Sequence, residues 1–322
     1  MSVANAPVNI VRGTHAQLIL FLVLNMWTSH FGLPVILGIV LLSKRVQRHP
    51  TFVNLLLAFI IVGISSSLLV YAGKTTGPEP SSILCLLQAS LLYGVPALTS
   101  TAALILVFRM FITIRATFYG ADDYDRDHVI RLWAMLIAPY VAFFISVLAT
   151  AIIGAANPGR ISRSRRFFYC SVESDSLTNT LTIFSAITLF STLVLIVWTV
   201  VLLFRRWQLS KRGSYLKWTV DLSLPLRIIA FGIYIIAAMS LSLLSIKSPS
   251  NPAPDLVIAS ASTAVVLVFG TQTDILGVLC FWRRPRDKVS ETFHVDLNQA
   301  FDQLEESRPW ASKPLPPKPR PF

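Results

Sequence analysis

Among the ionisable residues inside long apolar stretches of this 322-residue chain, where a charge is costly to bury, three fall at a similar depth. Arg109 and Arg227 carry guanidinium groups, and Asp274 carries a carboxylate. One carboxylate that faces two guanidinium groups can accept bidentate, charge-assisted hydrogen bonds. These residues, with Gln272 and Asn54 at a similar depth, form a candidate inner polar switch. The alternative is that both arginines extend to lipid headgroups while Asp274 makes a local hydrogen bond.

Other residue types that carry chemistry do not form a catalytic set. The histidines are scattered along the chain, at His15, His30, His49, His128 and His294. They show no metal-ligand spacing, and the chain has no glycine-rich phosphate loop. A retinal-binding pump needs a lysine in its last helix, and residues 255–281 contain none. We therefore expect neither an enzyme nor a bound cofactor.

Seven apolar stretches supply the elements that position these side chains. They span residues 16–43, 51–73, 82–114, 129–154, 178–204, 222–246 and 255–281. A helix rises about 1.5 Å per residue, so about 20 residues cross a hydrocarbon core of about 30 Å. Lipid offers the backbone no hydrogen-bond partner, and such segments must therefore be helical. The sequence predicts an all-α fold, a bundle of seven transmembrane helices.

Composition supports a membrane domain over soluble ones. Hydrophobic residues make up 54% of the chain and charged residues 14%, against about 25% charged in soluble domains. The formal net charge of +12 raises the possibility of nucleic-acid binding. The basic residues gather at the ends of the apolar stretches, however, where they meet lipid headgroups. We expect membrane lipids as partners and no nucleic acid.

The distribution of basic residues predicts the orientation. With the N-terminus outside, the cytoplasmic segments hold fourteen lysines and arginines and the outer segments hold seven. This bias favours an outside N-terminus and a cytoplasmic C-terminus. The basic run 160–166 opposes it. The expected organisation is a short extracellular tail (1–15), a seven-helix membrane domain (16–281) and a cytoplasmic tail (282–322), in the plasma membrane.

Two of the three cysteines are expected to pair. In this topology Cys85 and Cys170 share the outer, oxidising face, whereas Cys280 lies at the inner end of the last stretch. A bond between Cys85 and Cys170 would hold the longest outer segment over the mouth of the bundle. The alternative is two unpaired thiols on the same face.

Polar and aromatic residues in the outer half are candidate ligand contacts. Gln88 and Tyr93 lie on the third stretch, Tyr71 on the second and Tyr234 on the sixth. Apolar surroundings with sparse polar points suit a small lipophilic or peptidic ligand. The alternative for each residue is simple packing, or a place in the interfacial aromatic belt.

The tail has two parts. Residues 290–307 place Phe293, Leu297, Phe301 and Leu304 on one stripe, which predicts an amphipathic helix that binds a protein partner or stays frayed. Residues 308–322 are rich in proline and are expected to be disordered. Within them, Lys313–Pro319 fits a ligand for an SH3-type groove, a pattern that is also common by chance.

The seven stretches, the outside N-terminus and the expected disulfide resemble the rhodopsin-like G-protein-coupled receptors over about residues 10–290. Residues 269–276 and 280–284 also resemble the end of the last helix in orphan fungal seven-helix receptor-like proteins. The main family ends its third helix with an acidic residue, an arginine and an aromatic residue. This chain departs from that pattern, because Phe108 precedes Arg109. It departs again at 274–278, which contain neither Pro nor Tyr.

The resemblance implies a receptor that senses an extracellular or lipophilic ligand and signals through a heterotrimeric G protein. The G-protein-facing loop would be the basic segment that contains Arg205, Arg206, Lys211, Arg212 and Lys217. The main alternative is a seven-helix transporter or channel, a class that often shows internal repeats and midplane ion sites. A sensor that acts without a G protein is a third interpretation.

Overall fold

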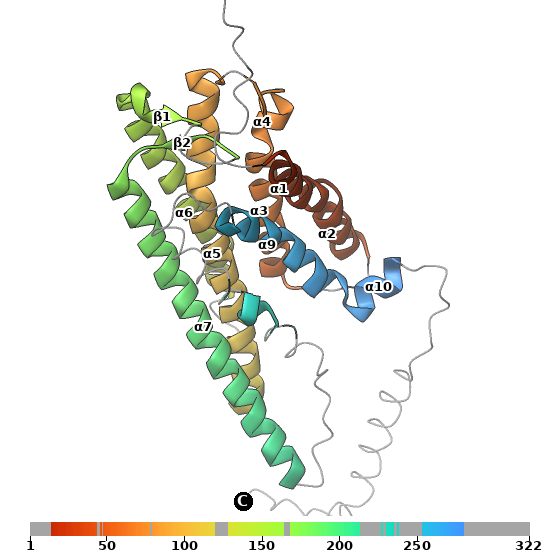
Figure 1. The fold of residues 1–322 in the computed structure, drawn as a ribbon. Helices are drawn as coiled ribbons and strands as arrows, with labels where there is room; N and C mark the ends of the chain where they lie inside the picture. The colour runs from red at the N-terminus through yellow and green to blue at the C-terminus, as the bar shows by residue number, and fades with distance from the viewer. Residues whose placement is uncertain are drawn as a thin grey trace, which may run out of the picture. The chain divides into compact units, whose positions relative to one another are not determined.

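The fold of the chain was analysed in a computed structural model (Figure 1). It describes residues 14–43, 46, 48–77, 79–119, 128–163, 168–212, 227, 230–234, 237 and 253–279. The chain divides into two units, Met1–Leu279 and Cys280–Phe322, and all described residues belong to the first. The amphipathic stripe at 290–307, the proline-rich segment 308–322 and the motif Lys313–Pro319 therefore lie outside the described residues.

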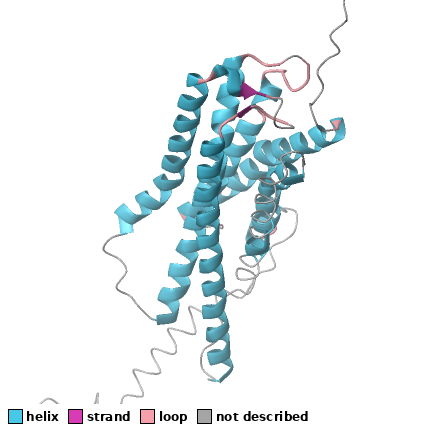
Figure 2. Cartoon of the chain, turned by 60° about the vertical axis from the view of Figure 1, so that its left-hand side comes forward, coloured by secondary structure: helices cyan, strands magenta, loops and turns pink. Residues whose placement is uncertain are grey.

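The described part is built almost entirely from helices, with one small β-hairpin. In chain order its elements are α1 (His15–Trp27), the π-helical η1 (Thr28–Gly32), α2 (Leu33–Leu42), α3 (Pro50–Ser66), α4 (Leu68–Tyr71), α5 (Ser82–Tyr119), α6 (His128–Ala156), the 3₁₀ turn η2 (Pro158–Arg160), β1 (Ile161–Ser162), β2 (Ser171–Val172), α7 (Asp175–Arg212), α9 (Ala253–Gly270) and α10 (Thr273–Leu279). The two strands are antiparallel, and Figure 2 shows them at one end of the bundle.

Four helical segments are long and apolar enough to cross a membrane: His15–Leu42, Ser82–Ala116, Ile130–Ala156 and Asp175–Arg205. Pro50–Ser66 and Asp255–Gly270 are apolar but shorter. The all-α, membrane-compatible character that the sequence predicts is thus confirmed. Most of the sixth stretch, 222–246, lies outside the described residues, so the count of seven stays a prediction, as does the orientation.

Helix α5 is the central element of the bundle. It packs against α3, α6 and α7, and Figure 1 and Figure 2 both show α5, α6 and α7 side by side. Leu98, Ala102 and Val107 of α5 are buried among apolar residues of the neighbouring helices. By contrast, α6 and α7 expose large apolar side chains such as Phe144 and Phe190. Hydrocarbon chains of lipid suit such outward faces, because they ask for no hydrogen bond.

The first membrane segment is interrupted by the π-helical turn η1. Pro34, just after this turn, has no N–H to donate and crowds the carbonyl four residues earlier. A wider turn relieves that conflict. Gly63 of α3 lies against the turn, because a Cβ atom added there would come within 2.1 Å of the Ser29 Cβ. The glycine therefore lets α3 and η1 approach closely.

Candidate functional site

Residues 158–163 and 168–174 form a small folded unit, called here the disulfide cap. Its hairpin pairs Ile161 with Val172 and Ser162 with Ser171. Cys170 is bonded to Cys85 in the first turn of α5, with the two Cα atoms 5.2 Å apart. The disulfide predicted from the sequence is therefore present, and it joins the cap to the central helix.

Two further side chains of α5 hold the cap. The buried Gln88 accepts a hydrogen bond at Oε1 from the backbone N–H of Cys170, at 3.1 Å. The Tyr93 hydroxyl donates to the carbonyl oxygen of Val172, at 2.9 Å. The disulfide, Gln88 and Tyr93 thus join α5 at three positions to residues 170–172 of the cap. Both residues were candidate ligand contacts, and the structure places them against the cap.

Arg163 joins the cap to the segment between α4 and α5. Its side chain is buried, and its guanidinium donates to the carbonyl oxygens of Lys74 (2.9 Å), Thr75 (3.2 Å) and Gly77 (3.1 Å). Its backbone N–H donates to the Glu79 carboxylate, at 3.1 Å. In the sequence this arginine belongs to the basic run that opposes the expected orientation. In the structure, its positive charge is bound by carbonyl groups of the protein itself.

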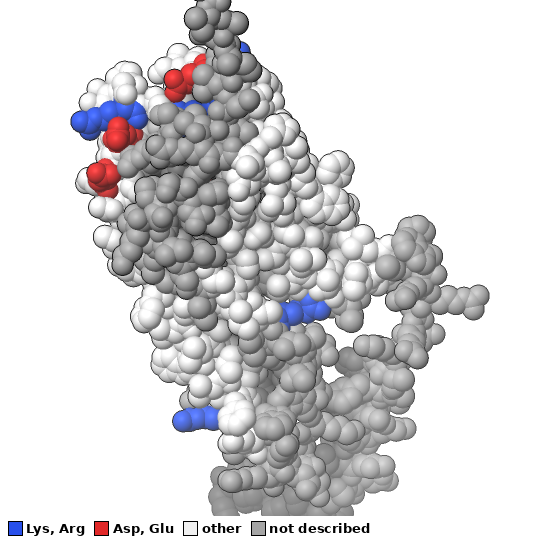
Figure 3. Space-filling view, viewed as in Figure 1, with Lys and Arg blue, Asp and Glu red and all other residues white. Residues whose placement is uncertain are grey.

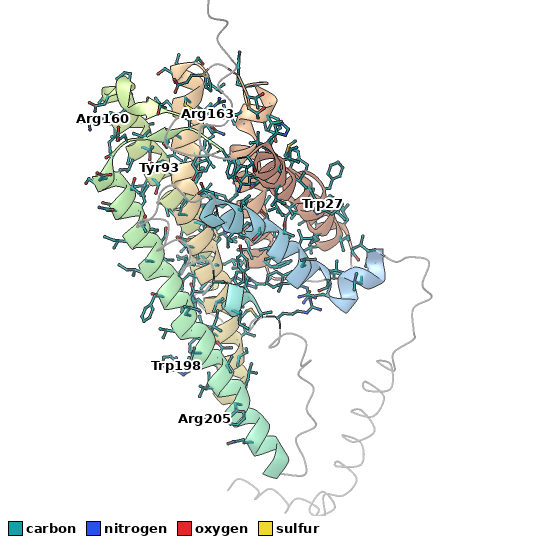
Figure 4. All side chains as sticks on the ribbon, in the orientation of Figure 1. Trp27, Tyr93, Arg160, Arg163, Trp198 and Arg205 are labelled. Carbon is teal, nitrogen blue, oxygen red and sulfur yellow. A yellow bond between two sulfur atoms is a disulfide. The ribbon has the colours of Figure 1, made fainter. Side chains whose placement is uncertain are left out.

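The other side of the cap reaches α1 and α9. The ring of Phe168 stacks on that of Phe21 in α1, with centroids 4.8 Å apart. The Tyr169 hydroxyl donates to Oδ1 of Asp255, at 3.0 Å, and Asp255 is buried in the first turn of α9. The cap therefore extends from α5 to α1 and α9. Figure 4 shows Arg160 and Arg163 at this capped end and Arg205 near the opposite end of α7.

The two remaining ligand candidates also bind other parts of the protein. The Tyr71 hydroxyl lies 2.5 Å from Nε2 of His30. The Tyr234 hydroxyl donates to the carbonyl oxygen of Val257, at 2.8 Å, and lies 3.4 Å from Oγ of Ser260. A ligand role for these residues stays a prediction. The sequence reasoning missed Phe168, Tyr169 and Asp255, although the two aromatic residues directly precede Cys170.

Three members of the candidate inner polar switch have different surroundings. Asn54 donates from Nδ2 to the carbonyl oxygen of Leu136, at 3.1 Å, and so joins α3 to α6. Arg109 lies close enough to Arg131 of α6 for the two positive charges to repel each other. Gln272 is buried in the short break between α9 and α10, and its Oε1 has no hydrogen-bond partner in the described part of the chain.

Arg227 binds the end of α9. Its guanidinium donates to the carbonyl oxygen of Val268, to Oγ1 of Thr271 (3.0 Å) and to the Thr271 carbonyl oxygen (2.9 Å). The last carbonyl groups of a helix lack partners inside the helix, and a cation there also complements the helix dipole. Asp274 follows in the first turn of α10, with only its backbone described. A contact between Asp274 and either arginine therefore stays a prediction.

The basic segment at the opposite end begins on α7. Arg205 is exposed on this helix. For Arg206, Lys211 and Arg212 only the helical backbone is described, and Lys217 lies outside the described residues. Because α7 has 38 residues, it is about 57 Å long, nearly twice the thickness of a hydrocarbon core. Helix α5 has the same length. Both helices are therefore longer than a hydrocarbon core is thick.

Charge is sparse on the described surface. On the face seen in Figure 3 most atoms belong to uncharged residues, and the acidic side chains gather at the upper end. Within the described ranges, no group of three or more His, Cys, Asp or Glu is placed to hold a metal ion. A scan against protein-family models gave no match, and a search of the curated proteins gave none either.

Proposed function

We propose that the protein is a membrane receptor of the plasma membrane. It senses a small lipophilic or peptidic ligand at its capped end and signals through a heterotrimeric G protein at the opposite end. The observation that carries this proposal is the disulfide cap, which is anchored to α5 on one side and to α1 and α9 on the other.

A fixed cap suits a receptor better than a carrier. A channel or transporter must open a wet path through each end of its bundle. Here that requires Phe168 to leave Phe21 and Tyr169 to leave Asp255, while the disulfide still holds Cys170 on α5. A receptor needs no such path, because a shift of packed helices by an ångström or two is enough to carry a signal. The cap can stay closed while a ligand changes the packing beneath it.

The opposite end offers a surface for a soluble partner. Helices α5 and α7 pack together and are both long enough to project past the hydrocarbon region. The projecting part of α7 carries Arg205, Arg206, Lys211 and Arg212. Basic side chains on two rigid helices can steer an acidic protein surface into place. This supports docking of a G protein at that end.

One observation favours the alternative, a seven-helix transporter or channel. The helix of the last apolar stretch is broken between α9 and α10, and broken helices in membranes often expose carbonyl groups that bind ions. In this protein the guanidinium of Arg227 binds the carbonyl groups of Val268 and Thr271. The break is thus held by a side chain, which weakens the alternative without removing it.

Co-purification tests the proposal directly. The full chain is purified with the G-protein α-subunits of its host, with and without a guanine nucleotide. We expect an association that the nucleotide releases. Exchanging Arg205 and Arg206 for glutamine should weaken it, whereas Arg160→Gln at the capped end is the matched control and should not. Association that ignores nucleotide, together with solute uptake into liposomes, would favour the transporter.

A further inference from the structure

A polar pair on an exposed face of the membrane segments has no part in the proposed receptor mechanism. His30 of η1 and Tyr71 of α4 are joined by a hydrogen bond of 2.5 Å. Both are exposed, Tyr71 to 51%. His30 lies within His15–Leu42, one of the four segments suited to cross a membrane. Hydrocarbon offers no hydrogen bond, so polar groups that face lipid are uncommon and call for a partner.

The hydrogen bonds of His30 determine which atom of the His30–Tyr71 pair can still bind a further molecule. Its Nδ1 lies 3.0 Å from the carbonyl oxygen of Met26, which can only accept, and 2.9 Å from Oγ of Ser29, which donates its own proton to the carbonyl oxygen of Asn25. Nδ1 therefore carries the proton, and Nε2 accepts from the Tyr71 hydroxyl. The Tyr71 oxygen keeps a free lone pair, since within the described ranges it has no further hydrogen bond. The pair thus presents one acceptor to its surroundings.

Exposed aromatic side chains lie beside His30 on the first segment. Trp27 and Phe31 lie on the same face of the first segment as His30, and their rings stack with centroids 6.2 Å apart. Both are exposed, to 55% and 63%. Ile64 of α3 is exposed to 47% and follows Gly63, where α3 touches the turn at Ser29. Trp27, His30, Phe31, Ile64 and Tyr71 are called here the aromatic seam.

The sequence around Tyr71 adds an independent, weaker indication. Leu68, Tyr71 and Lys74 follow the spacing of a short pattern proposed for cholesterol contact. Such patterns are frequent by chance. Their value here is that the tyrosine at the centre of the pattern is exposed, bonded to His30 and flanked by the stacked rings.

We infer that the aromatic seam binds a sterol, whose single hydroxyl donates a hydrogen bond to the Tyr71 oxygen while its rigid ring system lies on Trp27, Phe31 and Ile64. One acceptor matches one hydroxyl, and a stiff, flat molecule loses little conformational entropy against flat side chains. A phospholipid is a poorer fit at Tyr71, because an anionic phosphate needs a donor and the Tyr71 oxygen offers an acceptor. The assignment is independent of the proposed signalling role.

Photolabelling of the full chain tests this assignment. The protein is placed in phosphatidylcholine vesicles with a photoactivatable sterol that keeps its free hydroxyl, and labelled peptides are located by mass spectrometry. We expect labels in peptides that contain Trp27–Phe31 and Leu68–Lys74. Unlabelled sterol should compete, and its methyl ether, which cannot donate, should compete about two- to tenfold less well, as for one lost hydrogen bond.

Variants separate the seam from general lipid contact. Tyr71→Phe removes only the hydroxyl and should lower labelling by the same factor of about two to ten. Trp27→Ala should lower it as well. Trp198→Ala is the matched control, because Trp198 is also 55% exposed but lies on α7, on another part of the surface (Figure 4), and it should change nothing.

Three results would overturn the assignment. The first is equal labelling of these peptides by a phosphatidylcholine probe, which would mean a surrounding lipid shell only. The second is equal competition by the sterol and its ether. The third is unchanged labelling of Tyr71→Phe. If that variant does not fold, as judged by thermal unfolding, the ether comparison on the unchanged protein decides the question.

Discussion

Arg163 shows how one buried side chain organises the capped end. A guanidinium enclosed by protein must satisfy its donors, and Arg163 does so with three carbonyl groups of the segment between α4 and α5. Two of those carbonyl groups belong to Thr75 and Gly77, and Gly77 adopts φ +95°, a region that favours glycine. The segment is therefore shaped around the arginine, and the cap holds it in that shape.

Replacing Arg163 by methionine should destabilise the protein by about 1–3 kcal/mol, because three carbonyl groups lose charge-assisted hydrogen bonds. Thermal unfolding in detergent measures the loss, and hydrogen exchange should rise in residues 74–77. Arg160→Met is the control, since that side chain is exposed and its backbone bond to Glu173 is unaffected. Equal effects of the two substitutions would contradict the role given to Arg163.

The type of a residue shows which hydrogen bonds its side chain can make, but seldom which group it bonds to. Gln88 and Tyr93 are recognisable in the sequence as polar points in an apolar helix, and each is a candidate ligand contact with packing as the alternative. In the structure they bond to Cys170 and Val172 of the disulfide cap. The cysteine pair was predictable because, of the three cysteines, only Cys85 and Cys170 share the expected outer, oxidising face. The bonds of Arg163 depend on the path of a loop, which local sequence does not determine.

At the scale of helices, the crossing of α3 and η1 depends on one missing side chain. Gly63→Ala should cost about 1–3 kcal/mol, because the new methyl group would overlap the Ser29 side chain and push the helices apart. Gly38→Ala in α2 is a matched control, since a Cβ atom there meets nothing within 4 Å. That control should be neutral or slightly stabilising, as alanine favours helix. Unfolding temperatures of both variants give the comparison.

The break between α9 and α10 allows a test of the inner polar switch. Arg227→Gln should cost about 1–3 kcal/mol, because the carbonyl groups of Val268 and Thr271 lose their donor. If Asp274 also acts on Arg227, Asp274→Asn should raise ligand-free signalling or lower stability, and the double variant should be less than additive. Strict additivity in unfolding experiments would mean that Asp274 takes no part in such a switch.

The positions of the helices could be predicted from the sequence, because the length of an apolar run is a local property. The predicted stretch 16–43 corresponds to α1, η1 and α2, and 178–204 lies within α7. The interruptions were not foreseen. The π turn has a local cause in Pro34, but the close approach of α3 to it depends on Gly63, and the end of α9 at Thr271 is bound by Arg227. Such partners become visible only in the folded chain.

At the scale of the whole molecule, the orientation of the membrane domain is the prediction on which the other assignments depend. An epitope tag at the N-terminus should be accessible on intact cells, and a tag after Phe322 only after the cells are permeabilised. The physical reason is the excess of basic residues on the cytoplasmic segments. The burial of Arg163 strengthens the expectation, since a cation held inside the protein does not act at the lipid surface. The reverse labelling pattern would invert the topology.

The bond between Cys85 and Cys170 also has a consequence for biosynthesis. The two cysteines are 85 residues apart and α6 lies between them. In the proposed topology, oxidation must therefore wait until that helix is inserted and the segment after it has been translocated. A precursor whose α6 failed to insert would leave Cys85 without its partner, and the oxidised bond would then mark a chain in which both segments have reached the same side of the membrane.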